Sequence, residues 1–285
     1  MTDALSQSSR LAGQLPGLLL EAERVAHSFL RGWHGRRRAG TGEAFWQFRP
    51  YMPGESVRGI DWKETAKRGE AFVREKEWEA AQTLWLYRDP SESMNFSSSR
   101  QLPVKKHYAE VLMLALGMLA LDGGEQLGLV GTSLAPQAHA GAIERIYAGL
   151  PQQKHLMEDA RLITARSHAV IFGDFYAPPE SFLPFCERLA LRQVRGMLVQ
   201  VFDPAEESLP YEGRVKFKDM ENTAAPAVMI QQVEAIRAEY AEKYAAHRAH
   251  IQKTVEGWGW SFLALSTKTP YQDAMTQLYR CMEAR

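Results

Sequence analysis

Five short apolar segments, each continuous instead of alternating, constrain the fold of this chain more than any other feature. They lie at residues 83–87, 126–130, 169–172, 196–202 and 260–265. An apolar run without alternation is typical of a strand that is buried on both faces, as in a parallel sheet covered by helices. Segments with helical patterns separate these runs, so we predict a doubly wound α/β fold with a mostly parallel sheet.

The predicted helices of this fold follow or precede the apolar runs. They occupy residues 105–121, 142–150, 154–164, 179–193, 233–257 and 271–283. The alternation of strand and helix breaks between residues 210 and 230, where apolar and polar residues alternate from Arg214 to Lys218. Because such alternation is typical of a half-buried antiparallel strand, we predict a small β-hairpin inserted there.

Composition changes near residue 80, which divides the chain into two predicted parts. Residues 1–80 contain one amphipathic helix at 15–33, a loop rich in glycine and arginine, and a segment dense in tryptophan, tyrosine and arginine. That last segment predicts short strands and turns held by aromatic side chains. We therefore expect an N-terminal appendage over residues 1–80 and the α/β domain over residues 81–285.

The overall charge is balanced, with 34 basic and 34 acidic side chains, and 45% of the residues are hydrophobic. This much apolar material excludes intrinsic disorder as the dominant state. Zero net charge excludes a protein that binds polyanions over its whole surface, and we do not expect nucleic acid as a partner.

Several features predict a cytoplasmic location. The segment 1–10 lacks the apolar core of a signal peptide, and the longest apolar run, 111–121, falls short of the ~20 residues of a membrane span. Cys186 and Cys281 are the two cysteines, and we expect both to be buried and reduced.

Polar side chains follow two of the predicted strands at their carboxyl ends, where ligands bind in open α/β sheets. Asp89, Ser91 and Ser93 form a D-x-S-x-S pattern after the first strand, and Asp174 follows a later one. If these strands are neighbours, two carboxylates and two hydroxyls meet at one point. Oxygen ligands of this kind suit Mg²⁺, so the pattern predicts a magnesium site with an open coordination position.

The D-x-S-x-S turn on a doubly wound sheet resembles the metal-ion-dependent adhesion site of von Willebrand factor type A domains. The preceding segment is similar to the bacterial family called domain of unknown function 58 (DUF58). Two motifs carry this likeness: R-x-Y-x-x-G at Arg49, Tyr51 and Gly54, and R-x-I-D-W from Arg58 to Asp61 and Trp62. The resemblance spans about residues 15–280 and is more specific than a five-residue metal motif.

The resemblance implies a non-catalytic protein-interaction module, a partner of MoxR-type AAA+ ATPases in the assembly or maturation of other proteins. It implies that Asp89, Ser91, Ser93 and Asp174 hold a metal ion, through which an acidic side chain of the partner is captured. No small-molecule substrate is expected.

In the resembling domains a threonine ligand lies on the loop that corresponds to residues 150–155. That loop has no threonine here, and it carries Lys154, whose charge would lie where a cation sits. Thr132 is the nearest alternative hydroxyl, at another strand end. A lysine in place of the ion is one reading of this difference.

Simpler interpretations stay open for the candidate site. The D-x-S-x-S segment is also a sound strand-exit turn, because short polar side chains there bond to nearby backbone. Asp174 is also a suitable N-cap for the helix that follows it. A Mg²⁺-dependent phosphohydrolase that uses Asp89 is an alternative of a different class.

Two arginine-containing segments of the appendage have open interpretations as well. The set Arg49, Tyr51, Arg58, Asp61 and Trp62 forms either a partner-contact surface or a structural cluster in which Asp61 pairs with an arginine and the aromatic residues act as anchors. The run Arg36, Arg37 and Arg38 is either a solvated loop or a contact for polyanions or a membrane surface.

Overall fold

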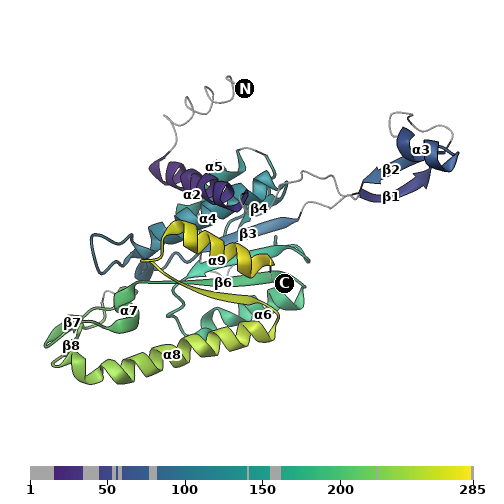
Figure 1. The fold of residues 1–285 in the computed structure, drawn as a ribbon. Coiled ribbons are helices and arrows are strands. Elements are labelled where there is room, and N and C mark those ends of the chain that lie inside the picture. Colours follow the sequence, from purple (N-terminus) through teal and green to yellow (C-terminus); the bar gives the residue numbers. More distant parts are fainter. Residues whose placement is uncertain are drawn as a thin grey trace. The chain divides into compact units, whose positions relative to one another are not determined.

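A computed structural model describes residues 16–34, 45–52, 56, 60–76, 82–139, 141–154, 162–222 and 224–283. Its central feature is a sheet of five parallel strands in the order β4-β3-β5-β6-β9 (Figure 1). The strands are β3 (Thr83–Arg88), β4 (Gln126–Leu129), β5 (His168–Gly173), β6 (Arg195–Phe202) and β9 (Ser261–Ser266). Each coincides with one of the continuous apolar runs, which confirms the predicted sheet.

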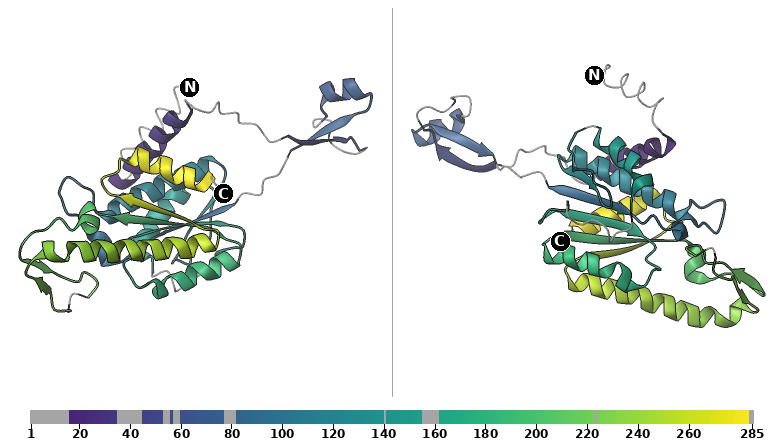
Figure 2. Two further views of the ribbon diagram at one scale, coloured as in Figure 1. Left: turned by 60° about the horizontal axis from the view of Figure 1, so that its bottom comes forward. Right: turned by 180° about the vertical axis from the view of Figure 1, so that it is seen from behind.

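Helices cover both faces of this sheet, as the doubly wound prediction requires. Figure 1 shows α4 and α9 on one face and α6 and α8 on the other, and Figure 2 shows the same layers from two further directions. The helices that accompany this sheet are α2 (Gly17–His34), α4 (Lys105–Asp122), α5 (Ala142–Gly149), α6 (Leu183–Leu191), α7 (Pro204–Ser208), α8 (Val233–Gly257) and α9 (Tyr271–Glu283). Most of the helix predicted at 154–164 lies outside the described residues.

The predicted hairpin is present as an antiparallel pair, β7 (Val215–Phe217) and β8 (Val228–Ile230). It lies in the connection between β6 and β9, which also contains α7 and α8. None of the helices in the described part of the chain is both long and apolar enough to cross a membrane.

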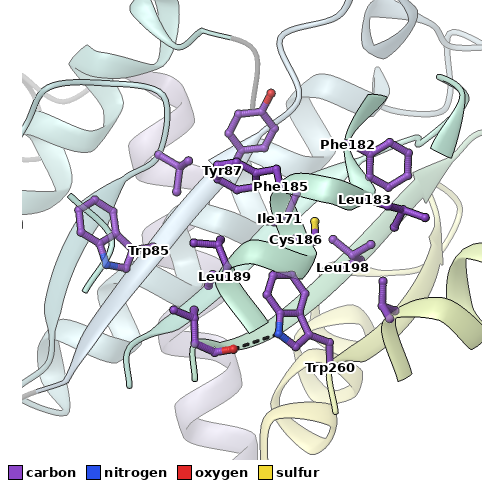
Figure 3. Packing of buried hydrophobic residues seen from close by; sticks show 14 of the residues in the cluster. Trp85, Tyr87, Ile171, Phe182, Leu183, Phe185, Cys186, Leu189, Leu198 and Trp260 are labelled. Carbon is purple, nitrogen blue, oxygen red and sulfur yellow. Dashed lines mark hydrogen bonds between the residues drawn. The ribbon is translucent and has the colours of Figure 1, made fainter. Parts of the chain in front are cut away.

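One core cluster packs between the sheet and the helices α6 and α8, as Figure 3 shows. Odd-numbered residues of β3 and β5, such as Trp85 and Ile171, point into this cluster because successive side chains of a strand face opposite sides. Cys186 lies in the same cluster and is fully buried, and burial raises the pKa of its thiol, so it is an unreactive core residue as predicted. Cys281 is only half-buried, which corrects the expectation that both cysteines are buried.

The division of the chain differs from the one predicted at residue 80. Residues 32–81 form one compact unit, and residues 1–31 together with 82–285 form the other. Helix α2 therefore belongs to the larger unit and not to the appendage. Its apolar face is buried there, and its Phe29 ring lies 5.4 Å from the Tyr279 ring of α9. Sequence patterning identified the helix correctly, but only the packing shows which unit covers its apolar face.

The described residues of the smaller unit form two antiparallel strands and one helix. They are β1 (Phe45–Pro50), β2 (Phe72–Lys76) and α3 (Trp62–Arg68). Asp61 caps α3, because its Oδ1 accepts hydrogen bonds from the backbone N–H groups of Lys63 and Glu64 at 3.1 and 3.0 Å.

A histidine at the amino end of β5 predicts a pH dependence of stability. His168 is half-buried, and burial together with the neighbouring Arg195 lowers its pKa from the ordinary 6.5. In the unfolded chain this ring takes up a proton near pH 6.5, whereas the folded protein resists protonation, so stability is lost as the pH falls below 6.5. We expect urea unfolding to show a smaller acid-side loss for His168→Gln than for the wild type. His250→Gln, on the exposed face of α8, is the control, and parallel pH profiles of wild type and His168→Gln would contradict the prediction.

Candidate functional site

The candidate site lies at the topological switch point of the sheet. The chain leaves β3 to form β4 on one side, and β5 then pairs with β3 on the other side. Ligands of open α/β sheets bind at such a point, beyond the carboxyl ends of the strands. Asp89 and Asp174 follow these neighbouring strands, and the backbone N–H of Asp89 donates to the carbonyl of Phe172 at 2.8 Å. The prediction required β3 and β5 to be neighbours in the sheet, and they are.

The D-x-S-x-S segment folds as a tight turn that leads into a short 3-10 helix, Glu92–Asn95. The Asp89 Oδ1 atom accepts a hydrogen bond from the Ser91 N–H at 3.0 Å, which is the local bond of an Asx turn. The Ser91 and Ser93 hydroxyl oxygens lie 3.1 Å apart. The three predicted side chains thus gather on one loop, and the interpretation as a strand-exit turn holds at the same time.

Asp174 has a different environment from Asp89, because it is buried and paired with a lysine. Its side chain is 2% exposed, and its Oδ2 lies 2.8 Å from Nζ of Lys105, the first residue of α4. Its Oδ1 accepts a hydrogen bond from the Tyr176 N–H at 3.2 Å. Both carboxylate oxygens are therefore engaged by the protein itself, and the bond to Tyr176 N–H is a local turn contact.

Lys105 also contacts a second carboxylate, that of Glu206 in α7, at 2.6 Å. Glu206 belongs to a capping box, in which its Oε2 accepts from the Asp203 N–H at 2.7 Å while Asp203 Oδ1 accepts from the Ala205 N–H at 2.8 Å. The Tyr176 ring lies 4.8 Å from the ammonium group, and burial raises the pKa of the Tyr176 hydroxyl, which therefore stays neutral. The ends of β5 and β6 are thus joined through one buried cation.

The backbone after Asp174 is unusual and is held by α8. Phe175 has φ of 55°, a left-handed conformation that costs a residue other than glycine of order 1–3 kcal/mol. Its carbonyl lies 2.7 Å from Nε2 of His247, and Gln200 Nε2 donates to the carbonyl of Asp174 at 3.0 Å. These contacts hold the turn in a shape that local preference alone does not favour.

A cavity of about 660 Å³ opens at this point of the sheet. Its lining combines aromatic side chains with carboxylates and hydroxyls, and we call its half-buried or exposed acidic residues, Asp89, Asp219 and Glu221, the rim. The aromatic residues are Tyr87, Phe175, Tyr176 and Phe182, and the polar ones include Asp89, Ser91, Ser93, Asp174, Asp219 and Glu221. All four predicted site residues therefore line one cavity, together with acidic residues from the inserted hairpin.

The hairpin segment contributes a contact that the sequence pattern did not predict. Glu221 follows β7 and is exposed, and its Oε1 accepts a hydrogen bond from the Ser93 N–H at 2.7 Å. A carboxylate from the chain itself thus lies on the D-x-S-x-S loop.

The loop expected to supply a further ligand lies elsewhere. Leu150 accepts a hydrogen bond from Arg88 Nη2 at 3.3 Å, and Gln153 Nε2 donates to the Val130 carbonyl at 2.9 Å. Within the described residues, 150–154 do not line the cavity, and neither does Thr132. Lys154 is exposed, so the expected positive charge at the site comes from Lys105 and not from Lys154.

These donors fit an ammonium ion better than a divalent metal ion. One of the two predicted carboxylates, Asp174, already binds Lys105. The other oxygen atoms of the predicted set belong to Asp89, Ser91 and Ser93. Magnesium at this place stays a prediction that the donor set does not favour.

The second predicted cluster lies in the smaller unit and is only partly described. Arg58 lies outside the described residues, as do Arg36, Arg37 and Arg38. Tyr51 N–H donates to the Ala71 carbonyl at 2.7 Å, and Arg49 Nη1 donates to the Pro50 carbonyl at 3.2 Å.

Two members of that cluster differ from the structural interpretation. The described contacts of Asp61 are those of a helix cap, and Trp62 is 67% exposed, so it does not anchor a core. An exposed tryptophan is more consistent with the other interpretation, a contact surface.

Sequence reasoning missed Lys105, Asp203, Glu206 and Glu221. A signal existed for the acidic pair in α7, because Asp203-Pro204-x-Glu206 is the pattern of a capped helix start with proline in its first turn. A weaker signal existed for Lys105, since a lysine that opens a helix is disfavoured by the helix dipole unless carboxylates compensate. Nothing in the pattern indicated that Glu221 lies on the Ser93 loop.

A parallel five-stranded sheet with helices on both faces defines a doubly wound α/β domain, as predicted. The chain belongs to the family described as "Protein of unknown function DUF58", whose model matches residues 47–250. This confirms the resemblance that the R-x-Y-x-x-G and R-x-I-D-W motifs carry.

Related proteins with the same extent occur in mycobacteria. The uncharacterized protein Mb1516 of Mycobacterium bovis and the uncharacterized protein Rv1480 of Mycobacterium tuberculosis are each 27% identical to this chain over 294 residues, covering 97% of it and 90% of the relative. Among solved structures, an aerotolerance-related membrane protein from Bacteroides fragilis is 12% identical with a TM-score of 0.44, covering 72% of this chain and 100% of that one. BatB from Bacteroides thetaiotaomicron is 11% identical with a TM-score of 0.41, covering 71% and 100%.

Proposed function

We propose that this protein is a non-catalytic interaction module that holds a basic side chain of a partner protein in the cavity at the carboxyl ends of β3 and β5. The observation that carries the proposal is the composition of that cavity, whose lining contains both aromatic residues and carboxylates. Aromatic faces and carboxylates together suit an arginine or lysine side chain, whose apolar stem and charged head need both kinds of contact.

The accessible charges of the cavity support a basic partner group. Asp89 is half-buried, Asp219 and Glu221 are exposed, and the positive charge of Lys105 is fully buried, where a partner cannot reach it. The rim therefore presents negative charge to an approaching molecule. Without a bound cation, the same charge disfavours an anionic group in this cavity.

An AAA+ ATPase of the MoxR type is the partner that we propose, on the ground of the DUF58 resemblance. We propose that the pair acts in the assembly or maturation of other proteins. The binding function itself does not depend on this choice, because the cavity argument concerns only the chemistry of the captured group.

The capture of an acidic partner side chain through Mg²⁺ is a second candidate. One observation favours it, namely that the Ser93 N–H already holds a carboxylate, that of Glu221. In this candidate Glu221 stands in for the partner's acidic group, and the partner displaces it. The two candidates require opposite effects of the rim charges, so they can be separated.

Filling the cavity mouth tests the binding site. Ala177 lines the cavity and is exposed, so Ala177→Trp blocks the mouth without disturbing the core. We expect it to weaken the binding of a MoxR-type ATPase, measured by calorimetry, by about tenfold or more, which corresponds to ~1.4 kcal/mol. Ala165→Trp, at an exposed position before the amino end of β5, is the matched control. Equal affinities of the two variants would contradict the proposed site.

The double variant Asp219→Asn with Glu221→Gln separates the two candidates in the same assay. It removes two rim charges, so a basic partner group should bind about tenfold more weakly. Tighter binding that requires Mg²⁺ would instead support the acidic-group candidate.

A further inference from the structure

The buried cation at the switch point comes from the chain itself. Lys105 begins α4, and its Nζ lies between a carboxylate at the end of β5 and one just after β6. The distances are 2.8 Å to Asp174 Oδ2 and 2.6 Å to Glu206 Oε1. The side chain of Lys105 is 0% exposed, against 2% for Asp174 and 15% for Glu206.

Burial at this depth requires that the charge be compensated. A lysine is almost never fully buried unless it is paired, because removing an ammonium group from water is costly. The two carboxylates supply that compensation, and the Tyr176 ring, 4.8 Å away, adds a favourable cation–π contact. The helix dipole disfavours a positive charge at the start of α4, so the carboxylates and not the helix hold the ammonium group in place.

The neighbouring acidic residue is accounted for without the cation. Asp203 is 0% exposed, and its Oδ2 accepts from the Ser98 N–H at 2.8 Å while its Oδ1 caps α7. Lys105 therefore compensates the charges of Asp174 and Glu206 in particular. An ion bound to Asp174 would have to displace an ammonium group that is already hydrogen-bonded and buried.

We propose that the Lys105 ammonium group replaces the divalent ion of a metal-dependent adhesion site. It neutralises Asp174 and Glu206 and ties β5, α4 and α7 together, so this end of the sheet keeps its geometry without a metal. The inference deepens the proposed function, because a site filled by the protein's own cation disfavours the candidate that needs Mg²⁺, and it rests on the proposed function only for the location of the site. The test of this inference measures stability and ion binding, whereas the test of the proposed function measures partner affinity. The inference and the proposed function can therefore fail separately.

The experiment compares thermal unfolding of the full chain in chelator with unfolding in millimolar Mg²⁺ or Mn²⁺. For the wild type we expect no ion-dependent shift of Tm. Lys105→Met keeps the apolar stem and removes the charge, which leaves Asp174 and Glu206 facing each other without a counter-ion. We expect its Tm to fall by about 10 °C and to recover in part when a divalent ion is added.

Two further variants keep the test decisive. Lys106→Met changes the adjacent, half-buried lysine and should leave both the Tm and the response to ions as in the wild type. If Lys105→Met does not fold, the variant that adds Asp174→Asn and Glu206→Gln removes the uncompensated charges and should fold again. Calorimetry on the wild type provides an independent reading, with no Mn²⁺ binding expected.

Three results would overturn the inference. A saturable Mg²⁺ or Mn²⁺ shift in the wild type that is lost in Ser91→Ala with Ser93→Ala would show that the loop holds an ion despite Lys105. A Lys105→Met protein as stable as the wild type would show that the ammonium group does not tie the strand ends together. Failure of the charge-neutral triple variant to fold would mean that the pairing is not the reason for the lysine.

Discussion

Asp174→Asn is expected to lower the free energy of unfolding by about 3–5 kcal/mol, because it leaves a buried lysine with one partner fewer. Asp89→Asn is expected to cost only about 1 kcal/mol or less, since Asp89 is half-buried and asparagine keeps an oxygen that can accept the hydrogen bond from the Ser91 N–H. The sequence pattern treats the two aspartates as equivalent metal ligands. Both line the cavity, but the structure predicts that Asp174 contributes far more to stability than Asp89 does.

Urea unfolding of the two variants measures this difference, and a double-mutant cycle with Lys105→Met tests its cause. If the pair is direct, the cost of Asp174→Asn should shrink in the Lys105→Met background by about 1–3 kcal/mol. Asp89→Asn should cost the same in either background. Equal costs for the two aspartates, or full additivity with Lys105→Met, would contradict this account of the site.

The second large effect concerns the core between the sheet and α8. A methyl group at Gly196 would lie 2.0 Å from the indole ring of Trp260, which is fully buried and donates a hydrogen bond to the Val194 carbonyl at 3.0 Å (Figure 3). Because this ring is enclosed on all sides, it cannot move away without breaking that bond. Gly196→Ala is therefore expected to destabilise the protein by about 3 kcal/mol.

Gly257→Ala is the matched control, because a Cβ atom there meets nothing within 4 Å. Replacing Trp260 by leucine makes room at Gly196 and costs stability itself, about 3 kcal/mol or more. In that background Gly196→Ala should cost much less than in the wild type, as measured by urea unfolding. A cost of Gly196→Ala that does not depend on the residue at position 260 would show that the clash is not its cause.

Local patterns predicted the part of the fold that depends on which residues must leave water. The continuous apolar runs identified the five strands, and the alternation at Arg214 to Lys218 identified the hairpin strand Val215–Phe217. The same patterns located helix α2 but not the unit that covers its apolar face, because an amphipathic helix specifies that it must be covered and not by what.

For the candidate site the limit is similar. Strand ends can be recognised in a sequence, so Asp89, Ser91, Ser93 and Asp174 were expected together at the carboxyl ends of the strands. They line one cavity. The partner of a buried charge lies far away along the chain: Lys105 is 69 residues from Asp174 and 101 from Glu206. No local pattern records such a pair.

The sequence by itself determined the layered α/β fold, the family and the position of an acidic pole, because burial periodicity and short motifs are local properties. Only the tertiary structure decided which cation meets Asp174, which carboxylate lies on the Ser93 N–H, and which unit contains α2. These three outcomes depend on contacts between residues far apart in the chain. Such residues can stabilise one another only after the sheet has formed and brought its strand ends together.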